Sequence, residues 1–305
     1  MMPPDPMLRR DLVGHGEHPP HPRWPGEARI AVNFNLNVEG GGESSLANGD
    51  AVSEGMLNDI GVPEFSGRRV PLVESAFEYG SRRGVWRVLD ILRDFGVTVS
   101  VLGVVRALEQ HPELARAFVA RGHELVSHGY RWIDYGTVPE VVERDHIRKA
   151  VAGITRLVGE RPLGWMTGRP GPNTRRLLAE EGGFLYDRDS LADELPYWLE
   201  MPQGPHLVIP YSYETNDNRF NENSGFATAG QFFEYMRDAF DVMYREGEAG
   251  APKLLSIGLH DRLIGRPGRA AGLVRLLEHM RARPGVWFCR GVDVARHWQG
   301  AFPPG

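Results

Sequence analysis

The stretch Ser127-His128-Gly129-Tyr130-Arg131-Trp132 follows directly after a short apolar run, Gly122-His123-Glu124-Leu125-Val126, which predicts a buried strand. A histidine in this position lies at the carboxyl end of a strand, where α/β folds place their catalytic groups. We therefore expect other functional residues to reach His128 from the ends of neighbouring strands. One histidine after one strand is weak evidence by itself, so the interpretation depends on the rest of the chain.

The bulk composition is that of an ordinary globular protein and argues against several functions. The chain has 305 residues, of which 41% are hydrophobic and 25% charged, and a net charge of -5. It therefore lacks the basic surplus of a nucleic-acid-binding protein, and no run approaches the roughly 18 apolar residues of a membrane span. The N-terminus lacks the apolar segment of a secretory signal, and a lone cysteine, Cys289, precludes an internal disulfide framework. We expect a cytoplasmic protein.

Predicted strands and helices alternate along most of the chain. Such alternation indicates a parallel sheet with helices outside it, and about seven core strands come close to an α/β barrel. We expect strands over 28–34, 97–102, 122–126, 162–167, 184–186, 206–213, 253–259 and 286–289, with helices over 84–95, 138–157, 173–181, 231–245, 270–281 and 292–298. Residues 105–121 are expected to form two helical pieces, the second starting at Pro112. Residues 43–81 are expected to be mostly loop.

The first 27 residues differ from the rest of the chain. Seven prolines in this segment, from Pro3 to Pro25, forbid a continuous helix or a central strand. We expect residues 1–27 to form an extended arm packed on the fold, and residues 28–305 to form a single domain.

Polar residues gather where the predicted strands end. Because parallel strands end at the same edge of a sheet, this gathering predicts an enzyme site there. The residues are Asn35, Asn37 and Glu39 after the first strand, then His128, Arg169, Asp187, Asn216, Asp217 and His260 after later strands.

This combination resembles the polysaccharide-deacetylase superfamily over about residues 28 to 298. The resemblance implies a distorted seven-stranded (β/α) barrel. The superfamily has two aspartates after the first strand, a histidine followed four residues later by another histidine, and a late Leu-His pair. This chain keeps His128 and the pair Leu259-His260.

The same motifs depart from the superfamily at the metal ligands. Asn35 and Asn37 stand where the aspartates are expected, and Trp132 stands where the second histidine is expected. Asparagine is a poor ligand for a divalent metal and tryptophan is none. We therefore expect no metal and no cofactor.

Four segments together are similar to a metal-independent branch of this superfamily, the allantoinases of bacterial urate catabolism. The resemblance implies a cytosolic homotetramer that hydrolyses the hydantoin ring of a small-molecule substrate, allantoin, to give allantoate. The segments are Asn35-Leu36-Asn37-Val38-Glu39-Gly40-Gly41, Ser127 through Tyr135, Gly164-Trp165-Met166-Thr167-Gly168-Arg169 and His206-Leu207-Val208-Ile209-Pro210-Tyr211.

Ring opening without a metal needs a side chain to activate the water and donors to hold the substrate. Glu39 is the candidate base, and His128 and His260 are candidates to shuttle the proton, because imidazole exchanges protons near neutral pH. The predicted substrate-binding residues are Asn35 and Asn37 for the ring amides, Arg169 for a carbonyl or the ureido oxygen, and Trp132 for stacking on the flat ring.

Two alternatives remain open at this point. One is a metal-dependent cyclic-imide or polysaccharide deacetylase that binds its metal through Glu39, His128 and a third group. The other is a catalytically silent barrel that only binds a ligand. The metal content of the purified protein distinguishes the first alternative from the metal-independent hydrolase. The variant Glu39→Gln distinguishes the second, because a silent barrel should keep its function unchanged whereas the hydrolase should lose orders of magnitude in kcat.

Overall fold

The computed structural model describes residues 10–55, 65–221 and 225–304. Strand β1 (Ile30–Val38) lies in the middle of the main sheet and is buried at every position. Its apolar residues Phe34, Leu36 and Val38 belong to the core beneath the outer helices, whereas Asn33 and Asn35 hydrogen-bond on the opposite, inner side. Side chains alternate between the two faces of a strand, so β1 turns its asparagines towards the interior of the barrel.

The main sheet has the strand order β10-β1-β4-β5-β6-β7-β9-β8, and β11 also pairs with β1. All of these pairings are parallel except the hairpin of β8 with β9. The strands are β4 (Ser100–Gly103), β5 (Glu124–Ser127), β6 (Gly164–Trp165), β7 (Tyr186–Asp187), β8 (Tyr197–Met201), β9 (Gly204–Val208), β10 (Lys253–His260) and β11 (Val286–Phe288).

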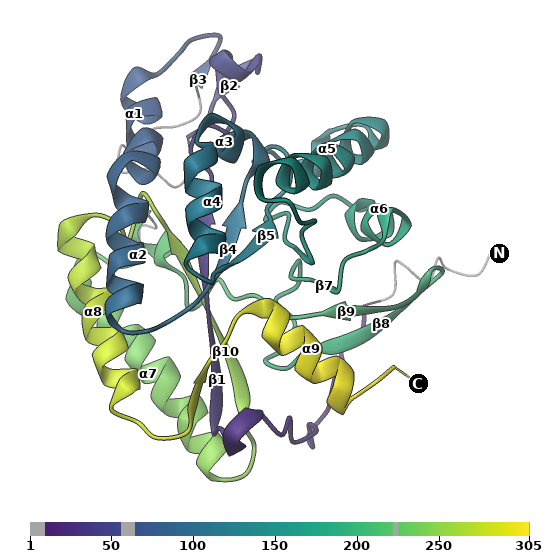
Figure 1. Cartoon of the computed structure of the whole chain (residues 1–305), viewed down its shortest axis with the longest axis vertical. Coiled ribbons are helices and arrows are strands. Elements are labelled where there is room, and N and C mark those ends of the chain that lie inside the picture. The colour runs from purple at the N-terminus through teal and green to yellow at the C-terminus, as the bar shows by residue number, and fades with distance from the viewer. Residues whose placement is uncertain (1–9, 56–64, 222–224, 305) are drawn as a thin grey trace.

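The sheet is curled, and helices cover its outside (Figure 1). Helices α2, α7 and α8 lie together along one side, while α5 and α6 cover the strands further along the sheet. The helices are α1 (Pro71–Tyr79), α2 (Val85–Asp94), α3 (Val105–Gln110), α4 (Pro112–Ala120), α5 (Glu140–Val158), α6 (Thr174–Glu181), α7 (Ala229–Glu248), α8 (Pro267–Arg281) and α9 (Gly291–Ala301). The predicted α/β fold of distorted (β/α) barrel type is confirmed, and each predicted strand and helix overlaps an observed one.

Several elements differ from the prediction. Strand β8 was not expected, and α1 and the antiparallel strands β2 (Val52–Ser53) and β3 (Phe65–Ser66) lie within the stretch that was expected to be loop. The predicted helix begins at Gly84, but a π-helical turn over Gly80–Gly84 joins α1 to α2. The glycine is needed for close packing, because a Cβ on Gly84 would lie 2.0 Å from the carbonyl oxygen of Asp261. Predicted loop residues between 56 and 64 lie outside the described residues.

The described part of the arm lies against the barrel. Trp24 is buried and donates from Nε1 to the carbonyl of Lys253 at 3.2 Å. His297 Nε2 lies 2.8 Å from the carbonyl of Pro22, and His15 Nε2 lies 3.1 Å from that of Pro196. These contacts attach the arm to three separate parts of the chain.

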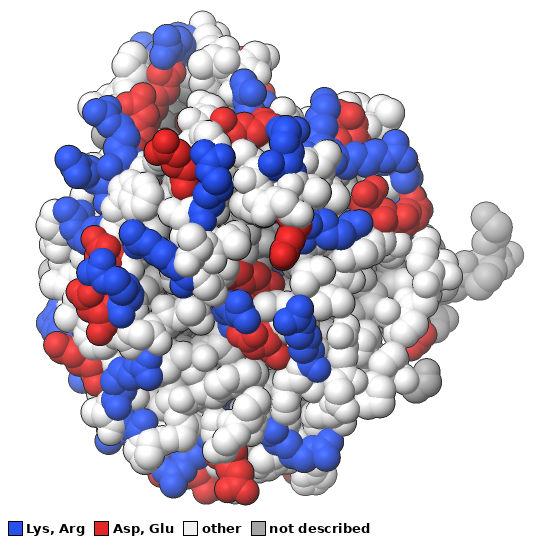
Figure 2. All heavy atoms as spheres, viewed as in Figure 1, with Lys and Arg blue, Asp and Glu red and all other residues white. Residues whose placement is uncertain are grey.

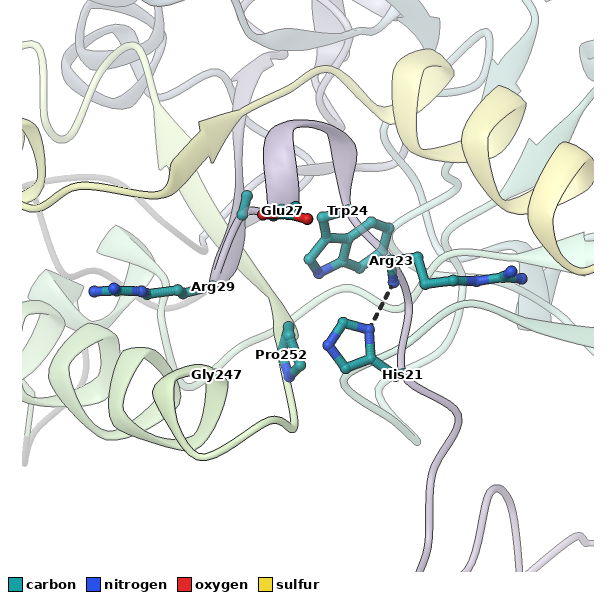
Figure 3. Close-up of a pocket in the computed structure, with 8 residues that line it drawn as sticks. His21, Arg23, Trp24, Glu27, Arg29, Gly247 and Pro252 are labelled. Atoms are coloured by element: carbon teal, nitrogen blue, oxygen red, sulfur yellow. Dashed lines mark hydrogen bonds between the residues drawn. The ribbon is translucent and has the colours of Figure 1, made fainter.

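The surface carries charges of both signs. On the face seen in Figure 2, lysine and arginine side chains are interspersed with aspartate and glutamate, without one dominant basic patch. No helix in the described ranges is both long enough and apolar enough to cross a membrane.

Candidate active site

The ends of three strands bring one carboxylate and two imidazoles together. Glu39 follows β1, His128 follows β5, and His260 is the last residue of β10. Glu39 Oε1 lies 3.2 Å from His128 Nε2 and 3.7 Å from His260 Nε2. The three side chains are 1%, 2% and 5% exposed. The cluster is therefore almost fully shielded from solvent, and the three predicted catalytic residues lie in one place.

A buried cation shares the carboxylate. Arg262 Nη2 lies 2.6 Å from Glu39 Oε2, and both side chains are 1% exposed. The guanidinium also lies over the rings of Phe77 at 4.4 Å and Trp132 at 5.3 Å. Burial opposes ionisation of Glu39, but the charges of Arg262, His260 and His128 outweigh it and hold the pKa of Glu39 well below its usual range. Glu39 is an anion at neutral pH.

The two histidines are oriented by different acceptors. His128 Nδ1 lies 2.7 Å from the carbonyl oxygen of Met166. His260 Nδ1 lies 2.6 Å from Asp217 Oδ1, and Asp217 Oδ2 accepts from the backbone nitrogens of His260 and Ile264 at 2.8 and 3.0 Å. Each imidazole is thus fixed at Nδ1 and presents Nε2 to Glu39, which is the arrangement that general acid–base catalysis requires.

Two further residues belong to this cluster, and the sequence alone assigned a role to neither. Asp217 was expected among the strand-end polar residues, but its partner His260 is 43 positions away in the chain. Arg262 was not among the predicted site residues. The signal that could have found Arg262 is chemical, since a carboxylate buried at a strand end needs a cation or several hydrogen bonds.

The predicted substrate-binding residues lie at different depths. Asn37 donates from Nδ2 to the hydroxyl of Tyr211 at 3.1 Å and to the carbonyl of Leu259 at 2.9 Å. Asn35 lies two residues deeper in the strand and is fully buried. Its Nδ2 donates to the carbonyl of Asn33 and to the hydroxyl of Ser256. These contacts place Asn35 in the interior network of the barrel, and its role in substrate binding stays a prediction.

Arg169 and Trp132 lie together beside the cluster. The Arg169 guanidinium is 4.0 Å from the centre of the Trp132 ring and forms an ion pair with Glu54 at 3.1 Å. Trp132 is 4% exposed and packs against Phe77. Trp132 therefore joins the site to the core, and Arg169 is the more accessible of the two, with 24% of its side chain exposed.

Two further strand-end residues have structural partners. Asp187 is buried and binds Arg175 at 2.9 Å and His206 at 2.6 Å. Asn216 donates to the hydroxyl of Tyr211, the same hydroxyl that Asn37 contacts. Asp187 thus belongs to a separate ionic cluster, whereas Asn216 is linked to Asn37 through the Tyr211 hydroxyl that both contact.

A partly buried carboxylate, that of Asp189, holds the loop behind His128. Asp189 accepts from the backbone nitrogen of Thr167 at 2.8 and 2.9 Å and from that of Gly168 at 3.2 Å. A Cβ on Gly168 would lie 2.9 Å from His128 Cε1, so this loop packs directly on the imidazole. The same loop supplies the Met166 carbonyl that holds Nδ1 of His128.

We expect Asp189→Asn to lower kcat by about 10–100-fold, because displacement of a catalytic group by roughly 1 Å has effects of that size. An asparagine offers one acceptor oxygen and turns an amide donor towards Thr167. Steady-state kinetics of the proposed hydrolysis measure the effect. Asp193→Asn is the matched control, since Asp193 also accepts from backbone nitrogens, those of Glu194 and Leu195. Equal rates for both variants would contradict a positioning role for Asp189.

The residues present do not fit a divalent metal of the deacetylase type. Asn37 turns its amide donor towards Tyr211 and Leu259, and Trp132 packs against Phe77. The charge that a metal would bring to Glu39 is supplied by Arg262. Across the described ranges, no group of three or more His, Cys, Asp or Glu side chains is arranged to hold a metal ion.

The geometry defines a class of protein: a deacetylase-type barrel in which a carboxylate, two imidazoles and a guanidinium lie buried together at the ends of the strands. A family model for polysaccharide deacetylase matches residues 67–181. A protein of Schizosaccharomyces pombe whose name places it among polysaccharide deacetylases is 38% identical over 313 residues, covering 96% of this chain and 98% of the relative. The chain belongs to the polysaccharide deacetylase family.

Two solved structures are similar to nearly the whole chain. The crystal structure of PuuE allantoinase is 54% identical with a TM-score of 0.95, covering 97% of this chain and 99% of that one. A structure from Pseudomonas aeruginosa PAO1, named for polysaccharide deacetylase, is 52% identical with the same TM-score and the same coverage. These matches confirm the predicted fold and the predicted family.

Proposed function

We propose that this protein hydrolyses the hydantoin ring of allantoin to give allantoate, with the water activated by side chains. The observation that carries the proposal is the buried cluster in which Glu39 contacts two imidazoles and Arg262. The similarity to PuuE allantoinase at 54% identity supports the choice of substrate. The burial supports a small substrate, because a polymer chain needs an open groove to reach its catalytic residues, and these side chains are at most 5% exposed.

The cluster suggests how the water is activated. A water held between Glu39 and His260 can attack the ring carbonyl while its proton passes to Nε2 of His260. Asp217 stabilises the imidazolium that forms, as a buried carboxylate does in a Ser-His-Asp triad. The lowered pKa of Glu39 makes this carboxylate a weak base by itself, so we assign it the orientation of the water and the stabilisation of positive charge. The predicted base function is thereby shared between Glu39 and His260.

The remaining side chains have roles in binding. Arg169 lies beside the cluster with its guanidinium on Trp132, where it can hold a carbonyl or ureido oxygen by paired hydrogen bonds. Asn37 can turn its amide oxygen towards a ring N–H, because its nitrogen already donates to Tyr211 and Leu259. Trp132 shields the site from water.

A second candidate function is deacetylation of a polysaccharide. It is favoured by the P. aeruginosa structure, which is 52% identical and named for that activity, and by the S. pombe relative. Asn37 and Trp132 do not fit the divalent metal that a deacetylase of this type would use. We therefore rank it after the hydrolysis of a cyclic amide.

The deciding experiment uses purified protein stripped with chelator, with its metal content read by elemental analysis. We expect allantoate to appear at an enzyme-like rate, with kcat of about 1–1000 s⁻¹, and addition of Zn²⁺ to leave that rate unchanged. Acetylated chitin oligomers serve as the competing substrate. Turnover only after metal is restored would refute the side-chain mechanism, and acetate release from the oligomers without allantoin turnover would favour the second candidate.

A further inference from the structure

A second carboxyl group lies beside the site, on the turn that follows β1. Asn48 Nδ2 donates to the carbonyls of Gly41 and Glu43 at 3.1 and 3.0 Å, which fixes the turn. Arg131 Nη2 also donates to the Glu43 carbonyl, at 3.0 Å, and Trp132 donates its backbone N–H to Gly42 at 2.9 Å. Residue 43 and Trp132 form a parallel bridge. The turn therefore holds Glu43 next to the strand-end segment that carries His128.

The Glu43 carboxyl is buried, and less opposite charge surrounds it than surrounds the Glu39 carboxylate. The residue is 6% exposed, and its Oε2 accepts from the backbone nitrogen of Gly41 at 2.5 Å. The Arg131 guanidinium, which donates to the Glu43 carbonyl, forms its ion pair with Asp50 at 2.5 Å.

Burial raises the pKa of Glu43 to about 7. Backbone N–H groups of Glu43 and Gly41 and the charge of Arg262 oppose this rise, and the anion of Glu39 adds to it. The two carboxyl groups, four residues apart, thus differ in charge near neutral pH. Glu39 is ionised, and Glu43 is protonated in a substantial fraction of molecules.

We propose that Glu43 is the general acid of the reaction and gives its proton to the leaving ring nitrogen as the carbon–nitrogen bond breaks. This inference rests on the proposed function. The assignment follows from two buried carboxyl groups four residues apart on the turn after β1. Glu39 contacts a cation and two imidazoles, whereas Glu43 accepts the backbone N–H of Gly41 and is bridged to the strand-end segment at Trp132. An amide nitrogen leaves slowly as an anion, so ring opening needs such a donor.

The step balances in atoms and charge. The water oxygen forms a bond to the carbonyl carbon, and the water proton goes to Nε2 of His260. The bond between this carbon and the ring nitrogen breaks, and its electron pair takes the proton of Glu43. The products are a carboxylic acid and a ureido N–H, after which the proton on His260 returns to Glu43 directly or through solvent.

The test is Glu43→Gln, which keeps an acceptor for the Gly41 nitrogen but cannot act as an acid. We expect kcat to fall by about 100–1000-fold while KM changes little, because general acid catalysis contributes factors of this size. In the unchanged protein, activity falls as pH rises through the pKa of Glu43, about 7, since only the protonated form donates. The pH profile of the Glu43→Gln variant should lack this fall in activity at alkaline pH. With hydantoins whose leaving nitrogen is more acidic, the difference in kcat between the unchanged protein and the Glu43→Gln variant should become smaller.

Glu143→Gln is the matched control, because Glu143 is also buried with a raised pKa but hydrogen-bonds to Thr174. It should leave kcat and the pH profile unchanged. Equal losses in Glu43→Gln and Glu43→Ala, independent of the leaving group, would show that Glu43 only shapes the turn and would overturn the inference.

A measurement without turnover separates this inference from the proposed function. With ¹³C-labelled glutamate side chains, the carboxyl signal that is absent from Glu43→Gln should titrate near pH 7. A Glu43 signal that is ionised throughout pH 5–9 would overturn the acid role. Failure of the unchanged protein to hydrolyse allantoin would instead refute the proposed function.

Discussion

We expect Glu39→Gln to lower kcat for allantoin hydrolysis by about a thousandfold. The carboxylate lies 3.2 Å from His128 Nε2 and 3.7 Å from His260 Nε2, so its charge acts directly on the imidazole that takes up the proton. Loss of one preorganised electrostatic contact in a water-excluded site has effects of about 10²–10³ on kcat. Steady-state kinetics over a range of pH, with folding checked by circular dichroism, measure the result. Unchanged activity would support a silent barrel or a different site.

The same substitution should also lower stability, which must be separated from catalysis. Glu39→Gln leaves the Arg262 charge buried without its carboxylate, and breaking a buried pair in this way costs about 3–5 kcal/mol. We therefore pair it with the double variant Glu39→Gln/Arg262→Met. The double variant removes both charges and should recover part of the lost stability but none of the activity. Recovery of activity with stability would show that Glu39 acts only through folding.

The second large effect is expected from Asp217→Asn, with kcat lowered by about 10²–10⁴-fold. Asp217 accepts from His260 Nδ1 at 2.6 Å and from the backbone nitrogens of His260 and Ile264. An amide in its place favours the wrong tautomer of the imidazole and no longer stabilises its charged form. KM should change little, because Asp217 is fully buried beneath His260 and does not reach the substrate.

A matched control exists for this variant as well. Asp241→Asn removes a carboxylate from another histidine, His279, at 2.8 Å on the outer helices, and should leave kcat unchanged. The tautomer of His260 can be read directly from ¹⁵N chemical shifts of the imidazole. A tautomer unchanged in Asp217→Asn, together with an unchanged kcat, would contradict the proposed proton acceptor.

Much of the fold was predictable because the signals are local. Apolar runs such as Val97–Leu102 and Lys253–Leu259 predict strands by themselves, and helices such as Glu140–Val158 show a buried stripe. Strand β8 and helix α1 were not predicted: β8 is five residues long and lies between Pro196 and Pro202, and Gly80 follows directly after α1. The helix predicted from Gly84 is continuous with α1, and a glycine is required at position 84 because the chain at Asp261 passes too close for a side chain.

The position of the candidate site was also open to prediction, but its electrostatics were not. The sequence by itself determined that Glu39, His128 and His260 follow strands, and parallel strands end at one edge. It could not determine that Arg262 binds Glu39, that Asp217 orients His260, or that Asp189 supports His128 through a loop. These contacts join residues from separate strands and loops, and only the tertiary structure decides which groups are buried together. Because burial and neighbouring charges set each pKa, the same residue type is an anion at Glu39 and is partly protonated near neutral pH at Glu43.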